Sequence, residues 1–222
     1  YFAFTDDPKR DDMRLVYDSG IFYEFIPEPL PDMESLTIQR SLPLWEVEAG
    51  VPYAMLVTTN AGLWRYAVDD IVEFTSIYPP RIRVKGRLSE MLDEFGEALY
   101  AYEAERALEE AVQKMDLEKG AFTLGGYLPS ENDLPRHYWF VQFVEPIHRQ
   151  TLERLAGTLD ESLRDVNRHY AIRRESGALG KPEVHSITQN EINRWLDFRE
   201  KENAQSKLPK MLNRREDIEF FL

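Results

Sequence analysis

The fold of this chain is decided around the stretch Gly62-Leu63-Trp64-Arg65-Tyr66-Ala67-Val68-Asp69-Asp70-Ile71-Val72. An apolar run precedes it, from Tyr53 to Thr59, and Asn60-Ala61-Gly62 between them favours a tight turn. The pattern predicts a strand, a turn and a second strand, with Asp69 and Asp70 displayed where the second strand begins. Such an acidic pair can bind sugar hydroxyls or a metal ion, or can cap a turn, and the residue types leave these alternatives open.

The composition limits the class of protein. The 222 residues suffice for one large domain or two small ones, and 43% hydrophobic with 30% charged residues is ordinary for a globular protein. No apolar run reaches the ~18 residues of a membrane helix, and no cationic, apolar leader is visible, so neither a membrane segment nor a secretory signal is expected. Cysteine is absent, which excludes disulfides and thiolate chemistry. A cytoplasmic location is expected.

The net charge of −13 argues against non-specific nucleic-acid binding, which depends on Lys and Arg neutralising phosphates. No nucleic-acid partner is therefore expected. A small anionic ligand remains compatible with the sequence, because a local basic cluster can outweigh the global charge.

The first part of the chain predicts an antiparallel β meander with Pro79-Pro80 as the clearest candidate boundary after it. Its expected strands cover residues 15–17, 21–26, 44–48, 52–59, 63–66 and 71–74. A further strand, Arg81 to Lys85, has one cationic face. The second part predicts strands at 122–127, 138–144 and 183–187, with helices at 102–115, 148–170 and 191 to about 202. Thr188 or Asn190 is expected to cap the last helix, and no element is assigned to the tail after it. The fold class is therefore α+β: an antiparallel β-rich part followed by a small α/β sandwich.

Neither part contains a complete familiar catalytic set. There is no Walker-type glycine loop, no G-x-S-x-G elbow and no histidine cluster at metal-ligand spacing. The four histidines are scattered and are expected to be surface or structural residues.

Several stretches together resemble one family. Gly62 to Val72 resembles the "GLYRYRxGDVV" signature of the auxin-responsive Gretchen Hagen family of acyl acid-amido synthetases. Tyr1 to Phe4 with Ser19 to Pro27 resembles its bacterial branch. Further similar stretches, in the same order as in the family, are Leu159–Leu163, Asn167–Tyr170, Gly177–Val184 and Gln205–Lys210.

This resemblance implies a ligase of the acyl-adenylate-forming type. Such enzymes activate a carboxylic acid with ATP as an acyl-AMP, and this branch passes the acyl group to an amino acid to form an amide. Residues 1–85 would be the last β portion of a large N-terminal adenylating domain, and residues 86–222 a small mobile C-terminal domain after a hinge. The missing N-terminal domain is expected upstream of Tyr1 with the phosphate-gripping loop, so this chain alone is expected to be inactive.

The resemblance also implies site residues. Asp70 aligns with the aspartate that accepts hydrogen bonds from the ribose hydroxyls, and Tyr66 and Arg87 are the other nucleotide-binding candidates. Ser89 takes the hinge position, and Lys207 aligns with the catalytic lysine that reaches the α-phosphate and the attacking carboxylate. No metal site is expected within the chain, since Mg²⁺ would arrive with ATP, held mostly by phosphates and water.

Two departures from the signature leave alternatives open. Asp69 stands where the family has Gly, which could serve a turn that needs positive φ, and Ala67 stands where it has Arg, a possible phosphate contact. The chain could therefore be a catalytically degenerate interaction module of the same fold. An acyl-AMP former that uses a thiol or another acceptor is a further alternative.

Overall fold

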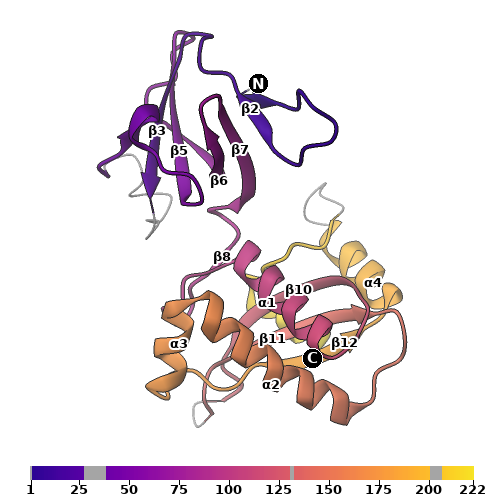
Figure 1. The fold of residues 1–222 in the computed structure, drawn as a ribbon. Coiled ribbons are helices and arrows are strands. Elements are labelled where there is room, and N and C mark those ends of the chain that lie inside the picture. The colour runs from indigo at the N-terminus through magenta and orange to yellow at the C-terminus, as the bar shows by residue number, and fades with distance from the viewer. Residues whose placement is uncertain (1, 28–38, 131–132, 201–206) are drawn as a thin grey trace. The chain divides into compact units, whose positions relative to one another are not determined.

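The computed structural model describes residues 2–27, 39–130, 133–200 and 207–222 (Figure 1). The chain divides into two compact units, Tyr1–Ser89 and Glu90–Leu222. This division reflects packing only and does not test the domain boundary predicted between residues 85 and 86, which stays a prediction. No helix in the described parts of the chain is long and apolar enough to cross a membrane.

The first unit is a curled antiparallel sheet of seven strands in the order β1-β2-β7-β6-β5-β3-β4. The strands are β1 (Ala3–Phe4), β2 (Met13–Leu15), β3 (Ile21–Pro27), β4 (Leu42–Pro43), β5 (Pro52–Thr59), β6 (Tyr66–Ile77) and β7 (Pro80–Arg87). The sheet curls so that β3 approaches the segments around β1 and β2: the Tyr23 hydroxyl donates to the Val16 carbonyl oxygen at 2.8 Å.

The concave face of this sheet holds the core of the first unit. Alternate residues of β3, β5 and β6 point inward, as the period of two requires. The buried residues include Tyr23, Phe25, Tyr53, Met55, Val57, Val72 and Phe74. The Phe25 and Phe74 rings pack edge to face with centroids 5.0 Å apart, which ties β3 to β6 through the interior.

Several sequence predictions for this unit are wrong. The strand expected over residues 15–17 lies at Met13–Leu15, so residues 16 and 17 follow it. Leu44–Glu46 is a 3₁₀ helix and not part of a strand, and Trp45 is 73% exposed, so the apolar–polar alternation there does not follow two faces of a sheet. Leu63 and Trp64 lie in a loop, and one continuous strand, β6, begins at Tyr66. Pro79-Pro80 marks no boundary, because Tyr78 and Pro79 form the hairpin turn between β6 and β7, and Pro80 already pairs with Ile77.

The second unit is an α/β sandwich around the sheet β10-β11-β12. Its strands are β10 (Lys119–Tyr127), β11 (Arg136–Phe143) and β12 (Glu183–Ile187), preceded by the hairpin β8 (Met91–Leu92) and β9 (Leu99–Tyr100). Its helices are α1 (Ala101–Lys114), α2 (Arg149–Val166), α3 (Arg168–Glu175), α4 (Gln189–Glu200) and α5 (Arg215–Phe221). β10 and β11 are antiparallel, whereas β11 and β12 are parallel.

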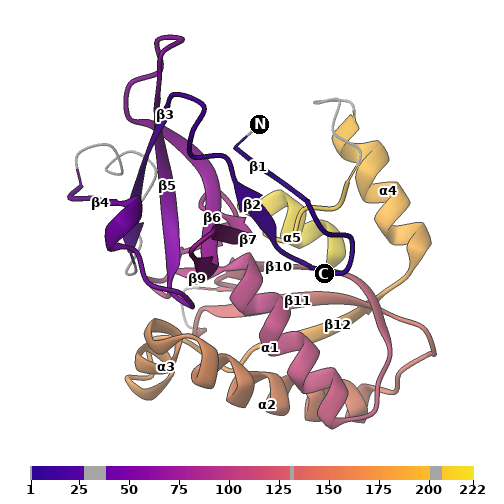
Figure 2. The same ribbon diagram turned by 45° about the horizontal axis from the view of Figure 1, so that its top comes forward.

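Helices lie on both faces of this sheet (Figure 2), and each face carries its own apolar cluster. Trp139 and Val141 of β11 pack with α1, α2 and α3, and Tyr138 and Phe140 pack with α4 and α5. The predicted leucine stripe of α2 is confirmed, because Leu155, Leu159 and Leu163 are fully buried. The alternation along β11 and the period of α2 therefore build the sandwich that the sequence predicts.

Two helix predictions need correction. The single helix expected over 148–170 is broken at Asn167, whose side chain accepts from Tyr170 N at 2.7 Å and donates to the Ala98 carbonyl oxygen at 3.1 Å. α5 was not predicted. The expected cap of α4 is confirmed at Thr188, which accepts from Glu191 N and donates its own N–H to the Glu191 carboxylate.

The tail before α5 is fixed to the free edge of β10. Leu124 N donates to the Lys210 carbonyl oxygen at 3.0 Å, and Leu212 N donates to the Leu124 carbonyl oxygen at 2.7 Å. The Lys210 ammonium also bonds the Glu105 carboxylate of α1 at 2.6 Å. The residues that follow Lys207 are therefore part of the sandwich.

Candidate functional site

Asp69 and Asp70 lie in a β-bulge of strand β6. Opposite β5, Ala54 pairs with Ile71 and Met55 with Val68, so the two aspartates are extra residues on the β6 side. A bulge re-aims side chains out of the regular alternation. The acidic pair is thus displayed by a bulge inside β6, so the prediction that it lies where the second strand begins is wrong. The turn predicted at Asn60-Ala61-Gly62 between the two strands is confirmed.

Across the next pair of strands, Asp70 faces Arg87 of β7. The Arg87 Nε and Asp70 Oδ1 atoms are 4.0 Å apart, and the two side chains are 61% and 38% exposed. A contact this long between exposed groups is a weak ion pair. The structure therefore brings Asp70 and Arg87 together and leaves both accessible to a ligand.

The loop before β6 presents aromatic side chains outward. Gly62 and Arg65 have positive φ values of 103° and 44°, and the Arg65 guanidinium is held by Glu24 at 2.5 Å and by the Gln39 carbonyl oxygen at 3.0 Å. With the loop anchored in this way, Trp64 is 81% exposed and Tyr66 is 55% exposed. Exposed aromatic rings near a polar site can stack on a base. Tyr66, at the start of the strand that carries Asp70, is exposed enough for such stacking.

Asp69 has a partner that the sequence did not reveal. Its carboxylate accepts from Ser89 N at 2.9 Å and from the Ser89 hydroxyl at 2.5 Å. Its carbonyl oxygen accepts from Leu88 N at 2.8 Å. Asp69 lies in an extended strand, so this position does not need the positive φ that a glycine would allow. The predicted hinge residue Ser89 is thus bound to the strand that carries Asp70.

Lys207 belongs to the second unit and is exposed. Within the described ranges its ammonium has no hydrogen-bond or ion-pair partner. It lies three residues before Lys210, whose ammonium is held by Glu105. Because the segment that follows is anchored, the backbone at Lys207 is held in place, while its ammonium stays accessible.

The second unit also has a hollow that sequence reasoning missed. Its volume is about 720 Å³, and its lining includes Arg149 and Ala156 of α2, Lys181, and His185 of β12. A Cβ atom on Gly157 would lie 3.3 Å from the Lys181 ammonium, so the glycine in α2 gives that side chain room. A glycine inside a well-formed helix pattern was the one sequence signal for this feature.

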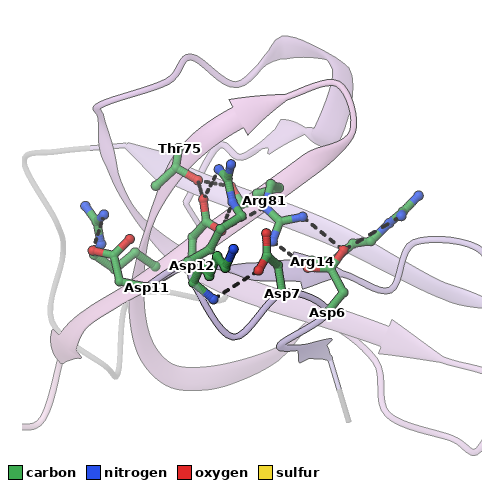
Figure 3. Close-up of polar contacts among 10 residues, drawn as sticks. Asp6, Asp7, Asp11, Asp12, Arg14, Thr75 and Arg81 are labelled. Carbon is green, nitrogen blue, oxygen red and sulfur yellow. Dashed lines mark hydrogen bonds and ion pairs between the residues drawn. The ribbon is translucent and has the colours of Figure 1, made fainter.

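A second polar cluster, in the loop between β1 and β2, is fully engaged within the protein (Figure 3). Asp12 accepts from Arg81 Nε at 2.8 Å, from both Arg10 donors at 2.7 and 2.8 Å, and from the Thr75 hydroxyl at 2.7 Å. Arg81 also binds Asp6 through both terminal nitrogens. The Arg10 guanidinium and the Thr75 hydroxyl hold the pKa of the Asp12 carboxyl well below its usual range. This cluster ties a loop to the sheet and leaves no free acceptor on Asp12 for a ligand.

The histidine that lies deepest is structural. His137 and Glu97 are both fully buried, and their Nε2 and Oε1 atoms are 2.9 Å apart. The described ranges hold no group of three histidine or acidic residues arranged for a metal ion. The polar groups around Asp70 and at Lys207 are therefore accessible to a ligand, whereas the His137–Glu97 pair is not.

Comparisons with known proteins agree on one family. Residues 14–87 match the model described as the GH3 family central domain, and residues 102–216 match the GH3 family C-terminal domain. The probable indole-3-acetic acid-amido synthetase GH3.1 of Arabidopsis thaliana is 26% identical over 96% of this chain and 37% of its own length. The indole-3-acetic acid-amido synthetase GH3.8 of Oryza sativa subsp. indica is 23% identical over 86% of this chain and 33% of its own length. The chain spans about a third of these relatives.

Solved structures agree on the fold. The AtGH3.15 acyl acid amido synthetase, in complex with 2,4-DB, superposes with a TM-score of 0.74 at 19% identity, over 97% of this chain and 38% of its own. A 2-hydroxyisobutyryl-CoA ligase in the postadenylation state, in complex with 2-HIB-AMP, gives a TM-score of 0.52 at 16% identity, over 94% and 39% of the two chains. The α+β fold class predicted from the sequence is confirmed.

Proposed function

Because this chain belongs to the GH3 family, as its motifs predicted, we propose that it is the C-terminal part of an ATP-dependent acid–amino acid ligase. The observation that carries this proposal is the exposed Asp70–Arg87 pair, which lies in the bulged strand pair within the matched central domain. The names of the relatives, which are acid-amido synthetases, support a carboxylic acid and an amino acid as substrates. The remainder of the relatives' length supports an N-terminal domain that completes the site.

The first step would be adenylation. A carboxylate oxygen of the acid attacks the α-phosphorus of ATP, the bond to the β-phosphate oxygen breaks, and pyrophosphate leaves. The Asp70 carboxylate suits the two vicinal ribose hydroxyls, which would donate to its oxygens in charge-assisted hydrogen bonds. Arg87 would hold nucleotide oxygens with its planar guanidinium, and Tyr66 would pack against the nucleotide.

Lys207 would act on the same step from the second unit. Its ammonium would approach the α-phosphate and the attacking carboxylate and neutralise the negative charge that develops as pyrophosphate leaves. Mg²⁺ would be held mostly by the phosphates of ATP and by water, where it would offset their charge. In the second step the amino nitrogen attacks the acyl carbon, the bond to AMP breaks, and the amine loses a proton as the amide forms.

The test is ATP–pyrophosphate exchange by the full-length protein against a panel of carboxylic acids, followed by mass spectrometry of products with amino acids present. Exchange with at least one acid and an amide product support the proposal. A thioester formed in preference to an amide when thiols are offered would assign the thiol alternative. No exchange with any acid would reject adenylation.

A matched pair of lysines tests the assignment of Lys207. Lys207→Ala should lower the exchange rate about 10²- to 10³-fold with unchanged thermal unfolding, because charge stabilisation of the transition state is lost. Lys210→Ala removes a lysine of the same segment whose ammonium is bound to Glu105, and should change exchange less than about threefold. Equal effects of the two substitutions would overturn the role of Lys207.

A catalytically degenerate interaction module is the second candidate. The observation that favours it is that the Asp69 carboxylate is occupied by Ser89 and that Ala67 replaces an arginine of the signature. This candidate expects no ATP binding by the full-length protein, whereas the ligase expects saturable binding. Isothermal titration with ATP and Mg²⁺ separates the two. The cytoplasmic location stays a prediction.

A further inference from the structure

The covalent connection between the two compact units is very short. Ser89 is the last residue of the first unit, and both its N–H and its hydroxyl donate to the Asp69 carboxylate. Glu90 is the first residue of the second unit, and its carbonyl oxygen accepts from Ala101 N at 3.0 Å. One peptide bond therefore separates a residue tied to β6 from a residue tied to the start of α1.

The Asp69 side chain determines where the attachment to the first unit ends. Cross-strand pairing of β6 with β7 stops at Asp70 and Arg87, and the backbone bond from Leu88 N to the Asp69 carbonyl oxygen adds one residue. Beyond that point no backbone acceptor of β6 receives the Ser89 N–H, and the Asp69 carboxylate takes this role. A glycine at position 69, as in the family signature, has no side chain with which to do so. The clasp, formed by the Asp69 carboxylate with the N–H and hydroxyl of Ser89, is thus a feature of this chain's own sequence.

The position of the clasp links it to the nucleotide site. Asp69 and Asp70 are adjacent in the same bulge, and Arg87, which faces Asp70, precedes Ser89 by two residues on the same segment. The bond between Asp69 and Ser89 therefore lies beside the two proposed nucleotide ligands, whose own strand pairing does not depend on it. We propose that Asp69 is a positioning residue that holds Ser89, a role that rests on the proposed function. With Ser89 held, the hinge rotation would be confined to the bonds on either side of the Ser89–Glu90 peptide.

This role predicts a separation between binding and turnover. Loss of the clasp leaves Asp70 and Arg87 in place, so the KM for ATP in pyrophosphate exchange should stay within about twofold. The second unit would then sample orientations that do not support reaction, so kcat for amide formation should fall about three- to tenfold, because orientation is lost and chemistry is not.

The direct test is hydrogen–deuterium exchange of the full-length protein in peptides that cover residues 86–91. Asp69→Gly should speed exchange of the Ser89 amide about threefold or more, because its acceptor is removed. Asp69→Asn keeps an oxygen acceptor, and Ser89→Ala keeps the N–H donor, so both should give intermediate exchange. Peptides from β5 should exchange as in the wild type in all variants, which controls for global unfolding.

The exchange and kinetic measurements separate two kinds of failure. Unchanged exchange at Ser89 in Asp69→Gly would overturn the clasp whether or not the protein is a ligase. Faster exchange with unchanged kcat for amide formation would overturn the positioning role. Absence of pyrophosphate exchange in the wild type would reject the proposed function, and the positioning role with it, while the amide exchange data would still decide the clasp.

Discussion

Strand β7 carries several arginines that pair with aspartates, and two of these pairs, at Arg81 and at Arg87, differ in distance and burial. The Nε atom of Arg81 lies 2.8 Å from Asp12 Oδ1, and the two side chains are 9% and 3% exposed. The corresponding atoms of Arg87 and Asp70 lie 4.0 Å apart, with side chains 61% and 38% exposed. The same two residue types therefore form a buried clamp at one point of the sheet and an open, loosely paired site at another.

The difference lies in how many partners each carboxylate has. Asp12 receives donors from Arg10, Thr75 and Arg81, and Thr75 sits in a bulge of β6 that turns its hydroxyl to this use. Removing one partner of a buried, satisfied pair leaves other charges uncompensated, whereas an exposed pair contributes little to stability. Asp12 is thus expected to govern stability and Asp70 to govern ligand binding.

The largest expected effect comes from removing the buried carboxylate. Asp12→Ala should lower the Tm by at least about 5 °C in thermal unfolding followed by circular dichroism, because Arg81 and Arg10 lose their shared acceptor. The adjacent Asp11, 78% exposed and bound to Arg83, provides the control, and Asp11→Ala should shift the Tm by about 1 °C or less. Similar losses in both variants would show that the burial of Asp12 does not set it apart from the exposed Asp11.

Asp70→Ala in the full-length protein should have the opposite profile. We expect kcat/KM for ATP in pyrophosphate exchange to fall about 10- to 100-fold, because the charge-assisted bonds to the ribose hydroxyls are lost. The Tm should stay within about 1 °C of the wild type, since the pair with Arg87 is long and exposed. Wild-type activity in this variant would remove Asp70 from the nucleotide site.

Acidification should weaken the clamp and the ion pairs beside it. The Arg10 and Thr75 donors lower the pKa of Asp12, a hydrogen bond from Arg81 lowers that of Asp6, and one from Arg83 lowers that of Asp11. Folded pKa values below the unfolded ones mean that this stability is complete above the unfolded pKa of about 4 and is lost as the pH falls toward the folded values. The Tm of the wild type should therefore decline below about pH 5. Asp12→Asn should show a shallower decline, and parallel pH profiles would argue against the clamp.

The smallest expected effect concerns a single hydroxyl. Thr75→Val removes the donor to Asp12 Oδ2 and should lower the Tm by about 2 °C. Thr75→Ser keeps the hydroxyl and should recover most of that loss. A serine variant as unstable as the valine variant would assign the effect to packing instead of the hydrogen bond.

Elements with regular local patterns could be predicted from the sequence. The leucine spacing of α2 identified its buried face, and β5 and β12 matched their expected ranges because alternation and β-branched residues are local signals. The break at Asn167 could not be predicted in this way, because its side chain bonds the Ala98 carbonyl oxygen 69 positions earlier. Leu44–Glu46 shows the converse error, in which alternation occurred without a sheet partner to give it two faces.

The sequence by itself determined the family and the α+β class, and it named Asp70 and Arg87 as separate nucleotide-binding candidates, since each of these depends on residue types in a fixed order. Only the tertiary structure distinguished the buried Asp12 from its exposed neighbour Asp11, because the partner of Asp12, Arg81, lies 69 positions away. It likewise gave Asp69 a hydrogen-bond partner, Ser89, 20 positions later in the chain. Carboxylates of one type differ in function only through burial and donors, and both arise when distant strands are brought side by side.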